Sequence, residues 1–318
     1  MAKQKTVFLH IGTNKTGTSS IQHHFFQNRD LLASHGICYP GLGQDAAAHH
    51  ELLSWVTHPK KHEKHLKALR KEIAPFDTTI ISSESLCDLE KPETLKEVFA
   101  GYDIRIILYL RDPVRYLLSW WQQDIQMGKR YPDMSQYLVT KRRSYIDLVD
   151  RWVEVFGKAN VTTHVYDRQQ LPKGDVLLDF KNLTGTSDIE GMQRLPWDNN
   201  PSVSGNLLYF KLVYNTLRLP DATSQKMIDG LTDASKLDST FRIVPKVPEI
   251  LAAGTRRIYN EELKELRDRH GVEVPTTRSI DGVRIPELDT IRRDFRKVME
   301  FSEEKGLPLA EMAKYVKF

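Results

Sequence analysis

The chain has 318 residues, of which 40% are hydrophobic and 28% are charged. This composition is typical of a folded globular protein and excludes intrinsic disorder. Lysine and arginine number 46 against 42 aspartates and glutamates, so the net charge is only +4. That excess is too small to indicate a nucleic-acid-binding protein, although it is compatible with a small anionic ligand or an anionic polymer.

Two further features of the composition narrow the class of protein. No run approaches the ~20 apolar residues that cross a bilayer, and the apolar segment at 7–9 is too short for a signal peptide. We therefore expect no transmembrane segment and no secretion signal. The two cysteines, Cys38 and Cys87, exclude a disulfide framework by their number. They favour a cytoplasmic protein with reduced thiols.

Short β-branched runs alternate with longer amphipathic runs in the first half of the chain. The predicted strands are 5–11, 78–83, 103–110 and 160–166, and the predicted helices between them include 17–34 and 114 to about 127. Asp112 and Pro113 supply an N-cap and a first-turn proline for the latter helix. Apolar strands separated by helices are typical of a mostly parallel sheet covered on both faces, hence an α/β fold.

The second half of the chain is expected to be mostly helical. The predicted helices are 206–218, 248–269 and 286–304, with loops at 196–201 and 272–286. We expect a single domain over 1–318, with an α/β core at 5–170 and a helical completion at 171–318. The basic run 58–72 holds six Lys/Arg against two Glu and predicts a helix with a solvated face. It could also guide an acidic acceptor.

A glycine- and hydroxyl-rich loop follows the first predicted strand. The segment His10-Ile-Gly-Thr-Asn-Lys-Thr-Gly-Thr-Ser-Ser-Ile-Gln22 leads from a strand into a helix. Such a loop can bind phosphate oxygens through backbone N–H groups, with Lys15 adding a full charge. It differs from the nucleotide-triphosphate loop because Thr18 occupies the lysine position, which argues against kinase or ATPase chemistry. The alternative is an ordinary strand-to-helix turn with surface hydroxyls.

A second polar cluster follows the strand at 103–110. Arg111 lies at the strand's carboxyl end, where ligands of parallel sheets bind, and Ser119 comes eight residues later in the next helix. A guanidinium and a hydroxyl can together hydrogen-bond one phosphate. The alternative is that Arg111 pairs with Asp112 and that Ser119 is a small packing residue.

Together the two motifs resemble those of the sulfotransferases that use 3′-phosphoadenosine-5′-phosphosulfate (PAPS). The similarity is greatest to a bacterial, carbohydrate-sulfotransferase-like subgroup. It is firm over 5–40 and 78–127, weaker over 199–215 and 256–271, and absent from 272 onward. The resemblance implies a P-loop NTPase-like sulfotransferase fold. It assigns to the 5′-phosphosulfate the loop residues Lys15, Thr16, Gly17, Thr18, Ser19 and Ser20, and to the 3′-phosphate Arg111 and Ser119.

The resemblance also implies a reaction. The sulfuryl group of PAPS would pass in line to an acceptor hydroxyl of a carbohydrate or other small molecule, leaving adenosine 3′,5′-bisphosphate. Lys15 would stabilise the leaving phosphate, and no metal is expected. Glu84, which follows the strand 78–83, is one candidate general base, and His49 and His50 are the others. Each has a structural alternative: a capping or ion-paired carboxylate for Glu84, and a core or helix residue for either histidine.

Two other functions remain open on the sequence. One is a nucleotide kinase or NTPase on a related P-loop core, and the other is a nucleotide-binding protein without catalysis. No nucleic-acid partner is expected, and the oligomeric state is not readable. We expect that at least one of Trp120 and Trp121 is buried, because aromatic side chains dominate cores.

Overall fold

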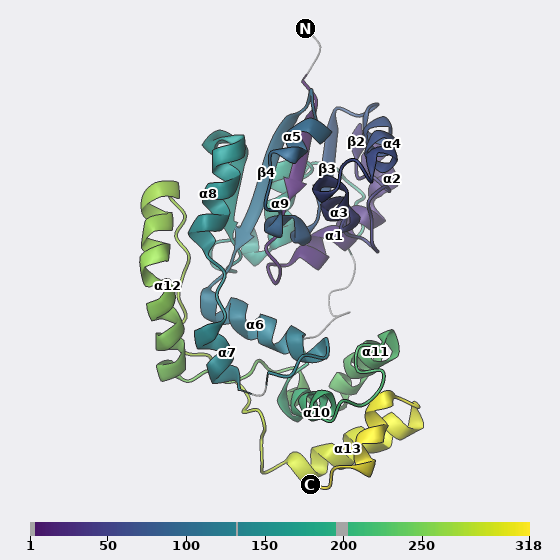
Figure 1. Ribbon diagram of the computed structural model, residues 1–318, viewed down its shortest axis with the longest axis vertical. Helices are drawn as coiled ribbons and strands as arrows, with labels where there is room; N and C mark the ends of the chain where they lie inside the picture. The colour runs from purple at the N-terminus through teal and green to yellow at the C-terminus, as the bar shows by residue number, and fades with distance from the viewer. Residues whose placement is uncertain (1–3, 132, 195–202) are drawn as a thin grey trace. The chain divides into compact units, whose positions relative to one another are not determined.

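The computed structural model describes residues 4–131, 133–194 and 203–318 (Figure 1). Within these residues the chain forms two compact units, each described by itself. The first comprises Met1–Asp112, Ser144–Leu195 and Glu262–Pro275, and the second comprises Pro113–Arg143, Pro196–Glu261 and Thr276–Phe318. Of the helices in these described ranges, none has both the length and the apolar composition that a membrane span requires.

A five-stranded parallel sheet forms the centre of the first unit. Its strands are β1 (Thr6–His10), β2 (Ile37–Cys38), β3 (Thr78–Ser82), β4 (Asp103–Leu110) and β5 (Val161–Val165), in the order β2-β3-β1-β4-β5. β1 therefore lies between β3 and β4, and its last residue, His10, is paired with Ser82 and Ile107. The segments that follow β1, β3 and β4 leave the sheet at the same edge. The predicted α/β fold with a parallel sheet is confirmed.

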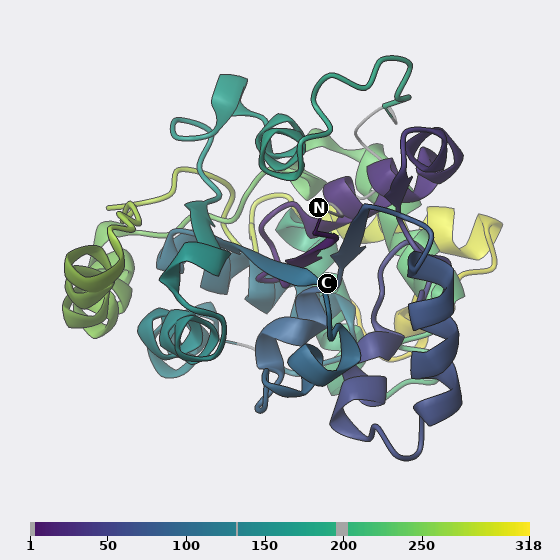
Figure 2. The same ribbon diagram turned by 90° about the horizontal axis from the view of Figure 1, so that it is seen from above.

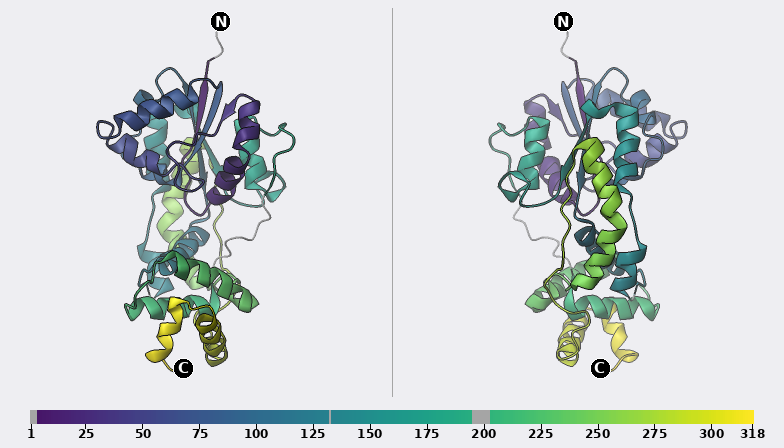
Figure 3. Two further views of the ribbon diagram at one scale, coloured as in Figure 1. Left: turned by 90° about the vertical axis from the view of Figure 1, so that its right-hand side faces the viewer. Right: turned by 90° about the vertical axis from the view of Figure 1, so that its left-hand side faces the viewer.

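Helices cover both faces of this sheet (Figure 2). On one face lie α1 (Thr18–Gln27), α2 (Arg29–Ser34) and α9 (Val176–Thr184), and on the other lie α3 (Glu51–Thr57), α4 (Glu63–Ile73), α5 (Thr94–Val98) and α8 (Tyr145–Phe156). The left view of Figure 3 shows the strands nearly edge-on between the two layers. Alternate side chains of β1 enter the two cores, since Val7 and Leu9 pack with α3, α4 and α8, whereas Phe8 packs against the core of α1 and α9.

The predicted helix 17–34 is two helices in the structure. The break is at Asn28, which is buried and which exchanges hydrogen bonds with the backbone of Gln193: its Nδ2 donates to the carbonyl at 2.9 Å and its Oδ1 accepts from the N–H at 2.8 Å. Asn28 Nδ2 also donates to the carbonyl of His24 at 2.8 Å. This amide fixes the end of α1 and the entry of α2 to a segment that is remote in sequence.

The basic run at 58–72 was predicted as one helix with a solvated face. The helix, α4, begins later, at Glu63, and the residues before it form turns. Leu66, Leu69 and Ile73 are buried along one face, while all six lysines and arginines of the run are exposed. The solvated face is confirmed and the helix start is corrected.

The second unit is helical. It contains α6 (Pro113–Gln126), α7 (Met134–Thr140), α10 (Gly205–Thr216), α11 (Gln225–Ala234), the first part of α12 (Glu249–His270) and α13 (Ile291–Glu304). The short 3-10 helices of the chain are η1 (Glu84–Asp88), η2 (Lys158–Asn160) and η3 (Pro172–Gly174) in the first unit, and η4 (Ser235–Leu237), η5 (Ser239–Phe241) and η6 (Pro308–Lys314) in the second.

The helical second half agrees with the prediction, although α9 and α11 were not among the predicted helices. α13 begins at Ile291, five residues after the predicted start. The predicted loop at 196–201 lies outside the described residues. Trp121 is 2% exposed, which confirms that at least one of the adjacent tryptophans is buried.

Candidate functional site

The loop after β1 remains paired with β4 beyond the end of the strand. The N–H of Ile11 donates to the carbonyl of Ile107 at 3.0 Å, and the N–H of Thr13 donates to the carbonyl of Tyr109 at 2.9 Å. The N–H of Tyr109 in turn donates to the carbonyl of Gly12 at 2.6 Å. These hydrogen bonds fix the path of the backbone between the end of β1 and the start of α1.

Gly17 closes the loop in a left-handed conformation, with a φ of 80°. A Cβ at this position would lie 2.9 Å from side-chain atoms of Tyr166 and of Val176. Glycine is therefore required here both by the backbone angle and by the close approach of the residues that follow β5.

Five backbone N–H groups of the loop and the first turn of α1 have no hydrogen-bond acceptor among the residues that the structure describes. They belong to Asn14, Lys15, Gly17, Thr18 and Ser19. N–H groups at a helix start carry partial positive charge, so a chain of them binds anions. The loop has the backbone chemistry of a phosphate- or sulfate-binding site.

Lys15 adds a charged side chain to this loop. It is partly buried and has a positive φ of 65°, which is uncommon for a residue with a side chain. The pKa of Lys15 is lowered to about 8, chiefly by burial and in addition by the positive charge of Arg111, while the negative charge of Glu84 opposes both effects. Lys15 thus faces one like charge and one opposite charge, and an anion bound beside it would relieve the repulsion from Arg111.

Arg111 follows β4 directly and reaches the loop. Its Nη1 donates to the carbonyl of Lys15 at 2.9 Å, and its guanidinium lies 5.4 Å from the ring centroid of Tyr166. The hydroxyl of Tyr145 donates to the Arg111 carbonyl at 2.8 Å. A stacked guanidinium with a fixed backbone is well oriented for a phosphate.

Glu84 is the first residue of η1, two residues beyond β3, and its side chain is 15% exposed. Its Oε2 accepts a hydrogen bond of 2.5 Å from Gln22 Nε2, and its Oε1 lies 3.8 Å from Nε2 of His50. Glu84 lies beside the loop, since a Cβ added to Gly12 would be 2.7 Å from the Cβ of Glu84. The predicted lysine, arginine and glutamate are therefore brought together by three neighbouring strands of one sheet.

The two adjacent histidines have different environments. His49 is 1% exposed; its Nε2 donates to the carbonyl of Pro40 at 2.9 Å, and its Nδ1 accepts from the N–H of Ser82 at 3.2 Å, a tautomer assigned from these partners. Burial lowers the pKa of His49 to about 4. His50 is half-buried, with Nδ1 3.1 Å from Ser83 Oγ and Nε2 toward Glu84. The geometry favours His50 over His49 as a participant in chemistry.

The hydroxyl residues of the predicted loop also differ from one another. Thr16 is buried, and its hydroxyl donates to the carbonyl of Thr13, which stabilises the loop itself. Thr18 is buried, Ser20 is partly buried, and Ser19 is exposed. Only these last three hydroxyls remain as candidate ligand donors.

Ser119 lies on α6, which belongs to the second unit and begins at Pro113. It is partly buried. Its assignment to the 3′-phosphate stays a prediction from the sequence.

Two residues of the site were missed by the sequence analysis. Gln22, which is 4% exposed, contacts Glu84, and Tyr166 contacts both Arg111 and Gly17. Tyr166 directly follows β5, so the strand-end rule that selected Arg111 could have found it. Gln22 is the last residue of the segment His10–Gln22 that the sequence analysis singled out, but it was given no role there.

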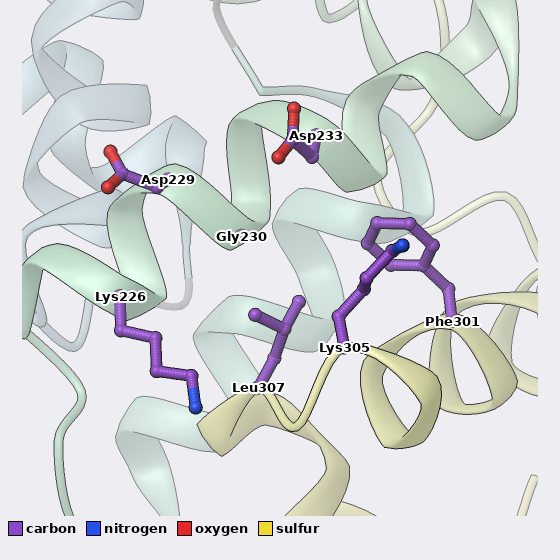
Figure 4. A pocket seen from close by; sticks show the side chains of 7 residues that line it. All are labelled: Lys226, Asp229, Gly230, Asp233, Phe301, Lys305 and Leu307. Carbon is purple, nitrogen blue, oxygen red and sulfur yellow. The ribbon is translucent and has the colours of Figure 1, made fainter.

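A pocket of about 360 Å³ lies within the helical unit. Figure 4 shows its lining residues: Lys226, Asp229, Gly230 and Asp233 on α11, Phe301 on α13, and Lys305 and Leu307 after it. Its two lysines and two aspartates balance in charge, so the pocket has no electrostatic preference for an anion. None of these residues was a candidate from the sequence.

Across the described ranges, no three or more His, Cys, Asp or Glu side chains are arranged to hold an ion.

Comparisons with known proteins give distant similarities. No protein-family model matches the chain. An uncharacterized protein of Archaeoglobus fulgidus is 22% identical over 245 residues, which are 73% of this chain and 67% of that protein. The crystal structure of a sulfotransferase from Alicyclobacillus acidocaldarius has a TM-score of 0.43 and 12% identity, over 86% of this chain and 98% of that one. A structure from the PezAT toxin-antitoxin system of Streptococcus pneumoniae has a TM-score of 0.29 and 15% identity, over 70% and 89%. With TM-scores this low, the function has to be argued from the residues of the site.

Proposed function

We propose that the protein is a PAPS-dependent sulfotransferase that acts on a hydroxyl of a carbohydrate or similar small acceptor. The observation that carries this proposal is the convergence of Lys15, Arg111 and Glu84 around a loop of unengaged N–H groups. The sequence motifs that resemble those of PAPS-dependent sulfotransferases contain the same loop and arginine.

The donor set fits a sulfated nucleotide. Its anionic groups need several N–H donors and fixed cations, which the loop, Lys15 and Arg111 offer. We assign the 5′-phosphosulfate to the loop, with Lys15, Gly17, Thr18, Ser19 and Ser20 as its ligands and Thr16 supporting the loop. We assign Arg111 to the 3′-phosphate. Ser119 is assigned to the same phosphate on the sequence resemblance alone.

In this proposal each residue has one part in the reaction. PAPS supplies the sulfuryl group that is transferred. Lys15 donates to the bridging oxygen on which charge develops as the sulfuryl group leaves, and such preorganised donors are a large part of catalysis. Glu84 takes the proton of the acceptor hydroxyl. His50, at 3.8 Å, is the alternative base.

The acceptor is proposed by resemblance to the carbohydrate-sulfotransferase-like subgroup. We further propose that the reaction takes place in the cytoplasm. In support, both cysteines, Cys38 and Cys87, are buried free thiols, in keeping with a reducing compartment.

Ligand-dependent thermal stability tests the proposal. Adenosine 3′,5′-bisphosphate should raise the melting temperature (Tm) of the protein, because a ligand that binds only the folded state stabilises it. ATP with Mg²⁺ is the comparison ligand, and stabilisation by ATP alone would favour a nucleotide kinase or NTPase. Transfer of ³⁵S from labelled PAPS to a panel of glycans, lipids and small alcohols then tests catalysis and identifies the acceptor.

A further inference from the structure

Gln22 makes a buried side-chain contact with the proposed base. It lies on α1 and is 4% exposed, and its Nε2 donates to Oε2 of Glu84 at 2.5 Å. The other carboxylate oxygen, Oε1, is on the side of His50. One oxygen of Glu84 is therefore held by the amide, and the other is left to meet a substrate.

This contact joins the base to the anion-binding loop. α1 is the helix that starts from the loop, so Gln22 and Lys15 belong to one continuous segment, seven residues apart. At the other end of the loop, Gly12 lies directly against the Cβ of Glu84. The carboxylate is thus positioned from two points of the segment that carries Lys15.

The charged and titratable groups that face Glu84 come from three other places. They are Lys15 in the loop, His50 before α3, and Tyr39 after β2, whose pKa is raised by burial and by the charge of Glu84. A lysine or arginine in place of Gln22 would add a second cation and weaken the carboxylate as a base. A neutral amide donor orients the carboxylate without adding a charge.

We propose that Gln22 is a positioning residue, which holds Oε2 of Glu84 so that Oε1 receives the proton of the acceptor hydroxyl. This inference rests on the proposed function. It assigns Gln22 to the proton-transfer step and not to the binding of PAPS, since its amide contacts the carboxylate and not the loop.

Gln22→Leu is the first test, with Gln27→Leu as the matched control. Gln27 lies at the exposed end of the same helix, where its Nε2 donates to Oε1 of Gln193 at 3.1 Å. We expect Gln22→Leu to lower kcat by about 10- to 100-fold, the effect of losing a hydrogen bond to a charged group. KM for PAPS should stay within about twofold, and Gln27→Leu should leave both parameters unchanged.

Gln22→Glu is a nearly isosteric second test, useful if Gln22→Leu does not fold. A second carboxylate beside Glu84 disfavours its ionised form. The acid limb of the kcat profile should therefore move to higher pH. The ¹³C carboxyl signal of Glu84, assigned through Glu84→Gln, should change its chemical shift in both Gln22 variants relative to the wild type.

Failure of the positioning role and failure of the proposed function give different experimental results. If the kcat and the pH profile of a folded Gln22 variant match those of the wild type, the positioning role is wrong and the proposed function stands. If the wild type transfers no sulfuryl group to any acceptor, the proposed function fails. In that case the carboxyl chemical shift still decides whether Gln22 acts on Glu84, and an unchanged chemical shift overturns the inference.

Discussion

Gly12 and Glu84 lie so close together that a Cβ added to Gly12 would be 2.7 Å from the Cβ of Glu84 and 3.0 Å from its Cα. Both residues follow parallel strands that are adjacent in the sheet. The loop that carries Lys15 and the proposed base therefore pack so closely that no side chain fits at Gly12, and the glycine permits this approach.

Gly12→Ala should separate the loop from Glu84. Gly12 has a φ of 91°, so alanine is strained by its backbone as well as by the missing space. Gly36→Ala is the control, because Gly36 has a φ of 75° but no atom within 4 Å of an added Cβ. We expect Gly36→Ala to cost about 1–2 kcal/mol from the backbone alone and Gly12→Ala to cost more. Equal losses of unfolding free energy in denaturant would contradict the close contact.

Lys15→Met should stabilise the protein without ligand and abolish its stabilisation by adenosine 3′,5′-bisphosphate. The folded protein keeps the Lys15 charge partly buried, with its pKa lowered to about 8 from the ordinary lysine value of 10.5. Between these values the unfolded chain binds more protons, so the wild type gains stability as the pH rises. At pH 7 we expect a Tm higher by about 2–4 °C in Lys15→Met. This advantage should shrink between about pH 8 and pH 10.5, and a constant difference would contradict the charge-burial argument.

Tyr166→Leu should weaken the binding of adenosine 3′,5′-bisphosphate by about threefold to tenfold. The variant removes the aromatic face over which the Arg111 guanidinium lies, a contact of about 0.5–2 kcal/mol. Tyr166→Phe keeps that face and should bind as the wild type does. Isothermal titration calorimetry measures both variants, and equal loss in the two would assign the effect to the hydroxyl instead.

Glu84→Gln should lower kcat by about 100-fold or more, because the amide cannot accept the acceptor's proton. Binding of adenosine 3′,5′-bisphosphate should persist. His50→Gln retains a polar group toward Ser83 and should lower kcat by less than about tenfold. Should the larger loss fall on His50→Gln, the base is the histidine, and Glu84 acts on it across the 3.8 Å gap.

His10 and His49 should make the protein sensitive to acid. Burial lowers the pKa of His10 to about 3 and that of His49 to about 4, from the ordinary histidine value of 6.5. Below about pH 6.5 the unfolded chain takes up protons at both residues and the folded protein does not, so stability falls until the folded values are reached. Within that window each histidine lowers the free energy of unfolding by about 1.4 kcal/mol for every unit by which the pH falls. His49→Gln should have a lower Tm at pH 7 and a smaller loss between pH 6.5 and pH 4.5, and an unchanged slope would contradict this account.

The sequence was sufficient for the strands that are marked by short apolar, β-branched runs. The strands that became β1, β3, β4 and β5 were predicted from such runs, and Lys15, Glu84 and Arg111 from their positions after them. β2 was missed because a pair of strand residues leaves no periodic pattern.

The remaining differences depend on contacts between residues that are remote in sequence. Asn28 ends α1 through Gln193, which is 165 residues away, and Gln22 meets Glu84 across 62 residues. A local pattern carries no information about such partners. The orientation of the base and the length of α1 could therefore be learned only from the folded chain.

The central place of β1 has a consequence for how the protein is made. β1 is synthesised before its neighbours β3 and β4, so it pairs with them only later. The contact between Arg111 and Tyr166 likewise forms only after both residues have been synthesised. At a synthesis rate of about 5–20 residues per second, roughly 8–30 s pass between the emergence of Lys15 and that of Tyr166. For many seconds a nascent chain therefore contains the Lys15 loop but lacks the contact between Arg111 and Tyr166. A ligand that needs both cannot assist the earliest steps of folding on the ribosome.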